Sequence, residues 1–173
     1  MEAVGFRPAQ PRDAADVVAV VNGAYRGELG KAGWTHEMGL VAGPRISEQG
    51  FLEMLARPGS VVLVAERAGR VVACVHLEAG GTECFLGMLS VRVAEQASGL
   101  GRALLAHAEG YARERLGARV MAMHVVATRT ELVAWYERRG YRRTGQRVPF
   151  APRPGITLLQ GPLEFERLEK ALR

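Results

Sequence analysis

Hydrophobic residues recur along the chain with two periods, one typical of helices and the other of strands. Residues 4–8 are predicted to start a strand, and Pro11–Val21 repeats apolar residues at helical spacing. The segment Gly27–Gly43 is rich in glycine and irregular. Ser47–Arg57 predicts a second helix, which begins at a capping serine and ends before Pro58-Gly59. The first third of the chain therefore predicts one strand followed by two helices.

Three strand-like segments follow in quick succession. Val61–Glu66 and Arg70–Glu78 flank Ala68-Gly69, a pair typical of a short hairpin turn. A second turn at Ala79–Thr82 leads into the third segment, Glu83–Val93. These connections are too short for a crossover, so the three strands are predicted to form an antiparallel meander.

The second half of the chain alternates helices and strands. Gly99–Leu116 is predicted to be a long amphipathic helix that Gly117 ends. The remaining predicted elements are a strand at Val120–Val126, a helix at Thr130–Arg139 and a strand pair at Tyr141–Val148 and Leu163–Leu168. Between the last two strands, Pro149–Pro162 is interrupted by prolines and glycines, which predicts an exposed excursion rather than a regular ladder.

The predicted order of elements is β-α-α-β-β-β-α-β-α-β-β. This order predicts a three-layer α+β fold, in which a mixed, mainly antiparallel sheet of about seven strands has helices on both faces. Neither an internal repeat nor a long linker divides residues 1–173, so we expect a single domain.

Composition narrows the function classes. The formal charge is +5, but the arginines are interleaved with glutamates and the aromatic content is 6%, so a nucleic-acid-binding face is not expected. There is no apolar run of about 18 residues and no secretory signal at the start, which predicts a cytoplasmic protein without a membrane span. Cys74 and Cys84 are expected to be buried apolar residues, and the histidines form no metal-binding cluster.

The segment Gln96–Gly101, between a predicted strand and a predicted helix, is the strongest chemical signal. The first amides of a helix have no partner within it, and the helix dipole makes this end attractive to an anion. Gly99 and Gly101 remove the Cβ atoms that would keep a diphosphate from these amides, and Arg102 adds charge at the rim. A P-loop is excluded because its Lys-Ser/Thr pair is absent, and Leu104 replaces the third glycine of the dinucleotide fingerprint.

The stretch from Leu89 to Tyr141 resembles the GNAT superfamily of N-acyltransferases. Gln96–Gly101 is similar to the motif Gln/Arg-x-x-Gly-x-Gly/Ala of that family, and Ala134–Tyr141 is similar to its Leu-Tyr-x-x-x-Gly-Phe string. The resemblance implies the fold predicted above, acetyl-CoA as cosubstrate, no metal, and transfer of an acetyl group to a primary amine. It also implies a cleft between the strand that carries Leu89–Val91 and the strand Val120–Val126.

In such a cleft the pantetheine arm pairs with backbone groups of the first strand and the diphosphate lies on the amides of the turn. The cofactor-binding residues implied in this way are Leu89, Ser90, Val91, Gln96, Ala97, Ser98, Gly99, Leu100, Gly101 and Arg102. Family members often have asparagine at position 129, where this chain has Arg129, which is expected to contact pantetheine or phosphate.

The implied reaction needs a base and a proton donor. An amine of pKa about 10.4 is almost fully protonated at pH 7, and a base or water must take its proton. Glu83 and His124 are the candidate bases, followed by His76 and Glu78 on the preceding strand. Tyr136 occupies the position at which the family hydrogen-bonds the departing sulfur. Its alternative role is that of a core aromatic residue packed beside Leu132.

The acceptor is not identified by the sequence. It is expected to lie between Gly27–Gly43, where Trp34 and Glu37 would receive a cationic amine, and Pro149–Pro162. A small molecule and a peptide amine remain equally open, as does a homodimer. The alternative function is an acyl-CoA sensor that binds the cosubstrate without catalysis.

Overall fold

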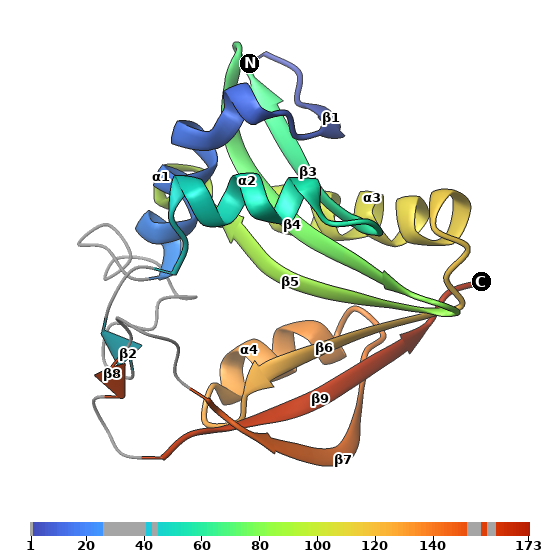
Figure 1. The fold of residues 1–173 in the computed structure, drawn as a ribbon. Coiled ribbons are helices and arrows are strands. Elements are labelled where there is room, and N and C mark those ends of the chain that lie inside the picture. The colour runs from blue at the N-terminus through green and yellow to red at the C-terminus, as the bar shows by residue number, and fades with distance from the viewer. Residues whose placement is uncertain (1, 26–40, 43–44, 152–156, 159–161) are drawn as a thin grey trace.

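The protein was analysed as a computed structural model, which describes residues 2–25, 41–42, 45–151, 157–158 and 162–173. Figure 1 shows the elements along the chain. They are β1 (Gly5–Pro8), α1 (Ala14–Tyr25), β2 (Val41–Ala42), α2 (Glu48–Ala56), β3 (Ser60–Arg67), β4 (Arg70–Gly80), β5 (Glu83–Val91), α3 (Leu100–Arg115), β6 (Val120–Val126), α4 (Thr130–Glu137), β7 (Arg142–Pro149), β8 (Thr157–Leu158) and β9 (Glu164–Ala171).

Seven strands form one sheet in the order β1-β3-β4-β5-β6-β9-β7, and β2 pairs with β8 apart from it. Every neighbouring pair in the large sheet is antiparallel except β5 and β6, which run parallel. The predicted mixed, mainly antiparallel sheet is therefore confirmed. The turn between β3 and β4 has positive φ at Ala68 (53°) and Gly69 (72°), the combination that a two-residue hairpin requires.

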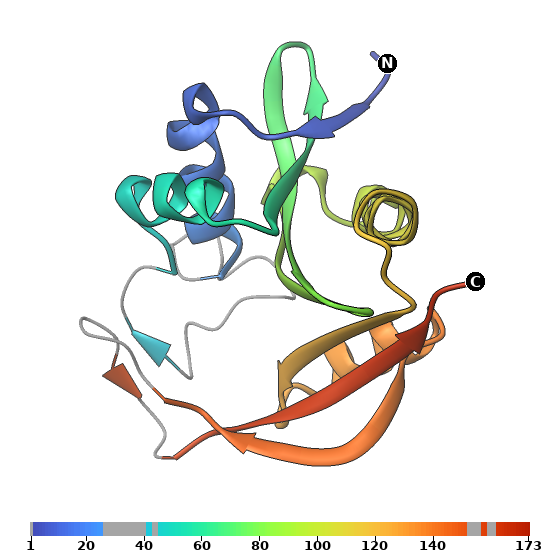
Figure 2. The ribbon, with the colours of Figure 1, turned by 45° about the vertical axis from the view of Figure 1, so that its right-hand side comes forward.

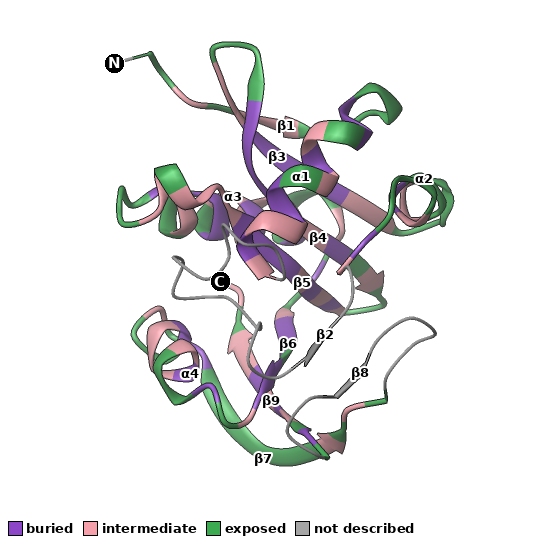
Figure 3. Cartoon of the chain, turned by 90° about the vertical axis from the view of Figure 1, so that its left-hand side faces the viewer, coloured by how far each residue is buried: buried purple, intermediate pink, exposed green. Residues whose placement is uncertain are grey.

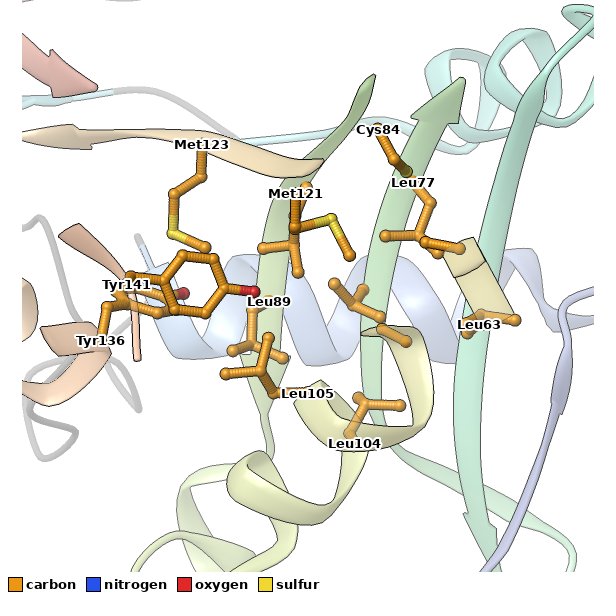
Figure 4. Close-up of a cluster of buried hydrophobic side chains, with 14 of the residues drawn as sticks. Leu63, Leu77, Cys84, Leu89, Leu104, Leu105, Met121, Met123, Tyr136 and Tyr141 are labelled. Atoms are coloured by element: carbon orange, nitrogen blue, oxygen red, sulfur yellow. The ribbon is translucent and has the colours of Figure 1, made fainter. Parts of the chain in front are cut away.

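Helices cover both faces of the sheet, as Figure 2 shows. On one face, α3 and α4 enclose a core that includes Leu104, Leu105 and Met121. On the opposite face, α1 and α2 pack Val17, Val21 and Phe51 against β3 and β4. Figure 4 shows part of the first core, in which Leu89, Leu105 and Met121 lie near Tyr136 and Tyr141. Both cores depend on alternating apolar positions in the strands, which is why the sequence predicted the layers.

Helix α1 extends beyond its predicted end. The prediction stopped at Val21, whereas the helix continues to Tyr25, and residues 11–13 form a separate 3-10 turn. The extension continues the apolar face, because Ala24 is buried together with Val17 and Val21 at helical spacing. This additional turn carries Tyr25 to the strand β5, where its hydroxyl donates a 2.8 Å hydrogen bond to the carbonyl of Leu89.

The two predicted irregular segments each contribute a short strand. Val41 and Ala42 pair with Leu158 and Thr157, which joins the end of Gly27–Gly43 to the segment Pro149–Pro162. Strand β7, at the edge of the large sheet, is exposed along nearly its whole length, and its arginines discourage pairing with other chains (Figure 3).

Candidate active site

A turn rich in backbone donors lies between β5 and α3. Ala97 and Gly99 both have positive φ, at 64° and 83°, and Gly99 caps the helix without a side-chain hydrogen bond. The first amide that bonds back into the helix is that of Ala103, which donates to Gly99 at 3.0 Å. The amides before it, from Leu100 to Arg102, therefore have no partner within the helix. Left-handed residues in such a turn arrange amides into a concave anion site.

The polar side chains of this turn support its shape. The amide nitrogen of Gln96 donates to the carbonyl of Val91 at 3.1 Å, and the hydroxyl of Ser98 donates to the carbonyl of Glu95. The carboxylate of Glu95 in turn forms an ion pair with Arg67 on β3. Because these side chains bind within the protein, the surface that the turn offers to a ligand is mainly backbone.

Strands β5 and β6 separate just before this turn. Their parallel pairing covers only three residue pairs, which join Glu83–Phe85 to Val120–Ala122. Farther along β5 a bulge places Met88 and Leu89 opposite the single residue Val75, and Met88 has φ of 60°. Figure 1 shows the two ribbons close together near the C-terminus and diverging away from it.

The separated part of β5 turns backbone groups away from β4. The amide of Arg92 donates to the carbonyl of Val72 on β4 at 2.9 Å. In an antiparallel ladder the next residue points the opposite way, so the N–H and carbonyl of Val91 face the opening beside β6. The carbonyls of Leu89 and Val91 accept hydrogen bonds from Tyr25 and Gln96, as described above. The amide of Val91 is thus presented to a ligand.

Two cavities adjoin each other at this site. The first contains the opening between β5 and β6 and the turn from Gln96 to Gly101. It has a volume of about 590 Å³. Its lining comprises Tyr25, Leu89, Val91, Gln96, Ala97, Gly99, Gly101, Arg102, Glu131, Leu132, Trp135, Tyr136, Arg138 and Arg139. We call it the donor cavity. Most of the predicted cofactor-binding residues line it. Ser90 is buried and donates to the carbonyl of Met88 at 3.0 Å, and Leu100 is a core residue.

Positive charge gathers at one end of the donor cavity. The guanidinium of Arg139 lies 3.8 Å from the centre of the Trp135 ring and donates to the Trp135 carbonyl at 2.8 Å. Burial lowers the pKa of Arg139, and the charges of Arg138 and Arg102 lower it further. No carboxylate of the described residues lies within ion-pair distance of Arg102 or Arg138. This end of the cavity therefore suits an anionic group.

The second cavity, which we call the acceptor cavity, has a volume of about 420 Å³. It extends from the opening between the strands over β4, β5, β6 and β9, and its lining includes His76, Glu78, Phe85, His124 and Arg129. The two cavities share four lining residues, which are Tyr25, Leu89, Leu132 and Tyr136. They therefore meet at the separated part of β5, next to the hydroxyl-bearing side chains of α1 and α4.

Tyr136 is buried at this junction, with 6% of its surface exposed. Its ring packs edge-on against Trp135 and Tyr141, at 5.0 and 5.7 Å between centroids. Burial raises the pKa of Tyr136, so its hydroxyl stays protonated at neutral pH and is a hydrogen-bond donor. Tyr141 has a different role, because its hydroxyl donates to Glu109 at 3.0 Å.

The candidate bases lie in different places. Glu83 is at the paired end of β5, accepts a hydrogen bond from Arg167, and is not among the residues that line either cavity. His124 lines the acceptor cavity with an exposed side chain, and partial burial followed by the charge of Arg167 lowers its pKa. The structure thus brings His124, but not Glu83, toward Tyr136.

Two further polar residues share the acceptor cavity with His124. The ring of His76 is 2.7 Å from the hydroxyl of Ser60, and burial lowers the pKa of His76 to about 4. Glu78 is exposed and lies 3.8 Å from Arg57.

Arg129, the residue expected to contact pantetheine or phosphate, immediately precedes α4. It is 7% exposed and donates to Glu131 at 2.8 Å. It lines the acceptor cavity rather than the donor cavity. The position of its side chain therefore favours the acceptor over the phosphate groups.

The sequence analysis did not identify Tyr25 or Trp135 as site residues. Tyr25 lies four residues after Val21 on the buried face of α1, and this spacing was the available signal. Trp135 was quoted only as part of the string that contains Tyr136. Trp34 and Glu37, the predicted amine contacts, lie outside the described residues.

Two absences hold for the described part of the chain. No three His, Cys, Asp or Glu side chains gather as they would around a metal ion. None of the described helices combines the length and apolar character that a membrane span requires.

Solved structures of other proteins share this architecture. A structure of ribosomal-protein-alanine N-acetyltransferase from Brucella melitensis superposes with a TM-score of 0.71 at 25% identity, over 97% of this chain and 99% of that one. The structure of yncA from Salmonella typhimurium with its cofactor acetyl-CoA gives 0.72 at 21%, over 99% and 95%. The ribosomal-protein-S18-alanine N-acetyltransferase of Escherichia coli gives 0.71 at 18%, over 98% and 94%.

The sequence comparisons differ in outcome. A search of curated protein sequences returned no match. The family model described as "Acetyltransferase (GNAT) family" matches residues 33–141, more than half of the chain, and this range includes the turn, the opening between β5 and β6, and Tyr136. The chain is therefore a member of the GNAT acetyltransferase family, whose enzymes use acetyl-CoA as cosubstrate.

Proposed function

We propose that this protein transfers the acetyl group of acetyl-CoA to a primary amine by direct attack in a ternary complex. The observation that carries the proposal is the junction of two cavities at Leu89 and Tyr136. One cavity ends at an anion-binding turn, and the other ends at titratable side chains. A thioester held at the junction is accessible to an amine that enters from the opposite side.

The residues of the donor cavity fit coenzyme A. The diphosphate binds the amides from Ala97 to Arg102, where charge-assisted hydrogen bonds each contribute about 1.5–3 kcal/mol. Gly101 leaves space between Val91 and Trp135, two lining residues of the cavity. A Cβ at position 101 would lie 3.5 Å from Val91 and 3.8 Å from Trp135 and would occupy part of that space. The amide of Val91 donates to the pantetheine arm or to the thioester oxygen. Arg102 and Arg138 compensate the phosphate charge.

His124 is the base that the site supports best. It lines the acceptor cavity, and its lowered pKa leaves the imidazole neutral at pH 7 and able to take a proton. His76 is also neutral, but a pKa of about 4 makes it a much weaker base. Glu83 is a poorer candidate, since it lines neither cavity and accepts a hydrogen bond from Arg167.

Tyr136 donates the hydrogen bond that stabilises the departing sulfur. A thiol has a pKa of about 8.5, below that of an unperturbed tyrosine, so the hydroxyl stabilises the developing charge more than it transfers its proton. Burial of the ring strengthens this hydrogen bond, because water competes for it less.

The proposal is tested by titrating acetyl-CoA into the protein in a calorimeter. In Gly99→Glu a carboxylate stands in the open space beside the amides of the turn, and we expect affinity to fall about 100-fold or more because like charges repel at short range. Gly145→Glu is the matched control, since Gly145 has the same φ of 83° in open space but lies on β7, outside both cavities.

Absence of acetyl-CoA binding by the native protein would overturn the proposal. So would equal affinity in the two variants. Binding of acetyl-CoA without release of free thiol toward any amine would instead support the sensor alternative.

A further inference from the structure

Four aromatic rings form a continuous row along the acceptor cavity. The rings of Phe85 and His124 are 5.6 Å apart, and those of His124 and Phe165 are 5.9 Å apart. Phe150, just after β7, continues the row at 5.0 Å from Phe165. All four residues line the acceptor cavity. We call this set the aromatic wall.

The sheet register explains how four distant residues come together. His124 pairs with Arg167, and Val126 pairs with Phe165, so the side chains of all these residues point to the same face of β6 and β9. Met121 and Leu168 point to the opposite face, where they join the core under α3 and α4. The wall therefore lies on the face of β6 and β9 opposite α3 and α4, and no described helix covers that face of these two strands.

The rings of the wall are not fully buried. Phe85, Phe150 and Phe165 are each partly exposed, and His124 is exposed. Large apolar groups that gather at a surface commonly mark a site of binding, because their exposure to water is unfavourable. A partner with a flat apolar face would bury these rings.

The described charges around the wall offer little to a polycation. Among the described residues that line the acceptor cavity, Glu78 is the one carboxylate, and Arg45 and Arg129 are cationic. The guanidinium of Arg167 also lies 5.1 Å from the centre of the Phe85 ring and thus occupies the position that an amine would take over it. The wall is consequently suited to stacking with a ring rather than to binding a chain of positive charges.

We propose that the acceptor is a small primary amine with an aromatic ring, which packs on the aromatic wall while its amino group lies at the junction near Leu89. The inference rests on the proposed function. In the reaction, the amine nitrogen bonds to the acetyl carbon as the carbon–sulfur bond breaks. The ammonium nitrogen gives up two protons: one passes through His124 to solvent before the attack, and the second is relayed to the departing sulfur, giving an amide and free coenzyme A.

The native protein tests the inference directly. Acetyl transfer to 2-phenylethylamine, n-hexylamine and spermidine is followed by release of thiol from acetyl-CoA. The first two amines have the same charge and similar length, so their ratio measures the ring. We expect kcat/KM to be about 10-fold higher for 2-phenylethylamine than for n-hexylamine, since one or two ring contacts each contribute roughly 2- to 10-fold. Spermidine should be the poorest acceptor. Equal values, or a preference for spermidine, would overturn the inference.

Substitutions in the aromatic wall test whether the wall causes the preference for an aromatic amine. Phe165→Leu keeps apolar volume but removes the ring, and we expect the ratio of 2-phenylethylamine to n-hexylamine to fall about 3- to 5-fold. Phe150→Leu at the end of the wall tests the same point if Phe165→Leu lowers the melting temperature. Leu52→Ala, an exposed residue of α2, is the control and should leave the ratio unchanged. A ratio unaffected by both phenylalanine variants would show that the wall does not bind the ring.

The two proposals fail in different ways. Transfer to amines without preference for a ring would refute the aromatic acceptor and leave the acetyltransferase intact. Absence of transfer to all amines, in a protein that binds acetyl-CoA in the calorimeter, would refute both.

Discussion

The donor and acceptor cavities adjoin each other but are built in different ways. Most of the donor cavity comes from two stretches of chain, Leu89 to Arg102 and Glu131 to Arg139, with Tyr25 of α1 added, and the first stretch offers backbone amides. The acceptor cavity draws its side chains from β4, β5, β6 and β9, which are distant in the sequence. A backbone site depends on a local conformation that a short motif specifies. A side-chain site depends on the register of a whole sheet, so it changes with substitutions that leave the fold intact.

The junction provides the largest expected effect on catalysis. Tyr136→Phe removes the hydroxyl while keeping the ring contacts, and we expect kcat to fall about 10- to 100-fold because a hydrogen bond to a charged group contributes about 1.5–3 kcal/mol. Affinity for acetyl-CoA, measured by calorimetry, should change little. Tyr141→Phe is the matched control, since its hydroxyl binds Glu109 and its loss should reduce stability rather than kcat. An unchanged kcat in Tyr136→Phe would show that Tyr136 acts only in packing.

Acid titration probes His76, a residue of the acceptor cavity. The folded protein keeps His76 neutral down to about pH 4, whereas the unfolded chain protonates a histidine near 6.5. The unfolded state therefore binds more protons in this window, so stability is full above about pH 6.5 and falls by roughly 3 kcal/mol toward pH 4. Denaturant unfolding at several pH values measures this loss. His76→Gln keeps a polar partner for Ser60 but does not titrate, and a loss of the same size in this variant would contradict the assignment.

The smallest expected effect is on the affinity for acetyl-CoA, at the end of the donor cavity where Arg102 and Arg138 lie. Coenzyme A carries a phosphate on its ribose, and the unpaired charges of Arg102 and Arg138 are suited to it. We expect acetyl-CoA to bind about 5-fold more tightly than its analogue without that phosphate, since an exposed charge pair contributes at most about 1 kcal/mol. Arg138→Gln should reduce this ratio. Arg142→Gln makes the same change of net charge on exposed β7 and should leave the ratio as it is. A ratio of one in the native protein would place the ribose phosphate elsewhere.

The fold was predictable where hydrophobic period and turn residues agree. The three-stranded meander, α3 with its end at Gly117, and the mixed, mainly antiparallel character of the sheet all followed from such agreement. The end of α1 did not, because the helix beyond Val21 is stabilised by burial of Ala24 rather than by a local signal. The pairing of β2 with β8 also lay beyond prediction, since two residues on each side carry no periodic pattern.

The site was predictable to the extent that it is local. The turn from Gln96 to Gly101 was identified from its spacing, although the structure turns the Gln96 side chain back to Val91 instead of toward the cavity. The base was harder to select, because Glu83 and His124 both belong to strands that border the cleft. Only the extent of pairing between β5 and β6 separates them, and this extent is a property of two strands rather than of either one. Tyr25 was missed for another reason, because the last turn of α1, which carries it to Leu89, was not predicted.

The bulge at Met88 and Leu89 fixes the number of residues in this part of the chain. Leu86 and Leu89 belong to the same core although an unbroken strand would direct them to opposite faces. Deleting one residue between them would restore regular pairing with β4, and it would also reverse the direction of every backbone group up to the turn. The chain can therefore vary in sequence along this strand far more readily than in length, because the spacing from Met88 to Gly99 sets the distance between the junction and the turn that we propose binds the phosphate groups.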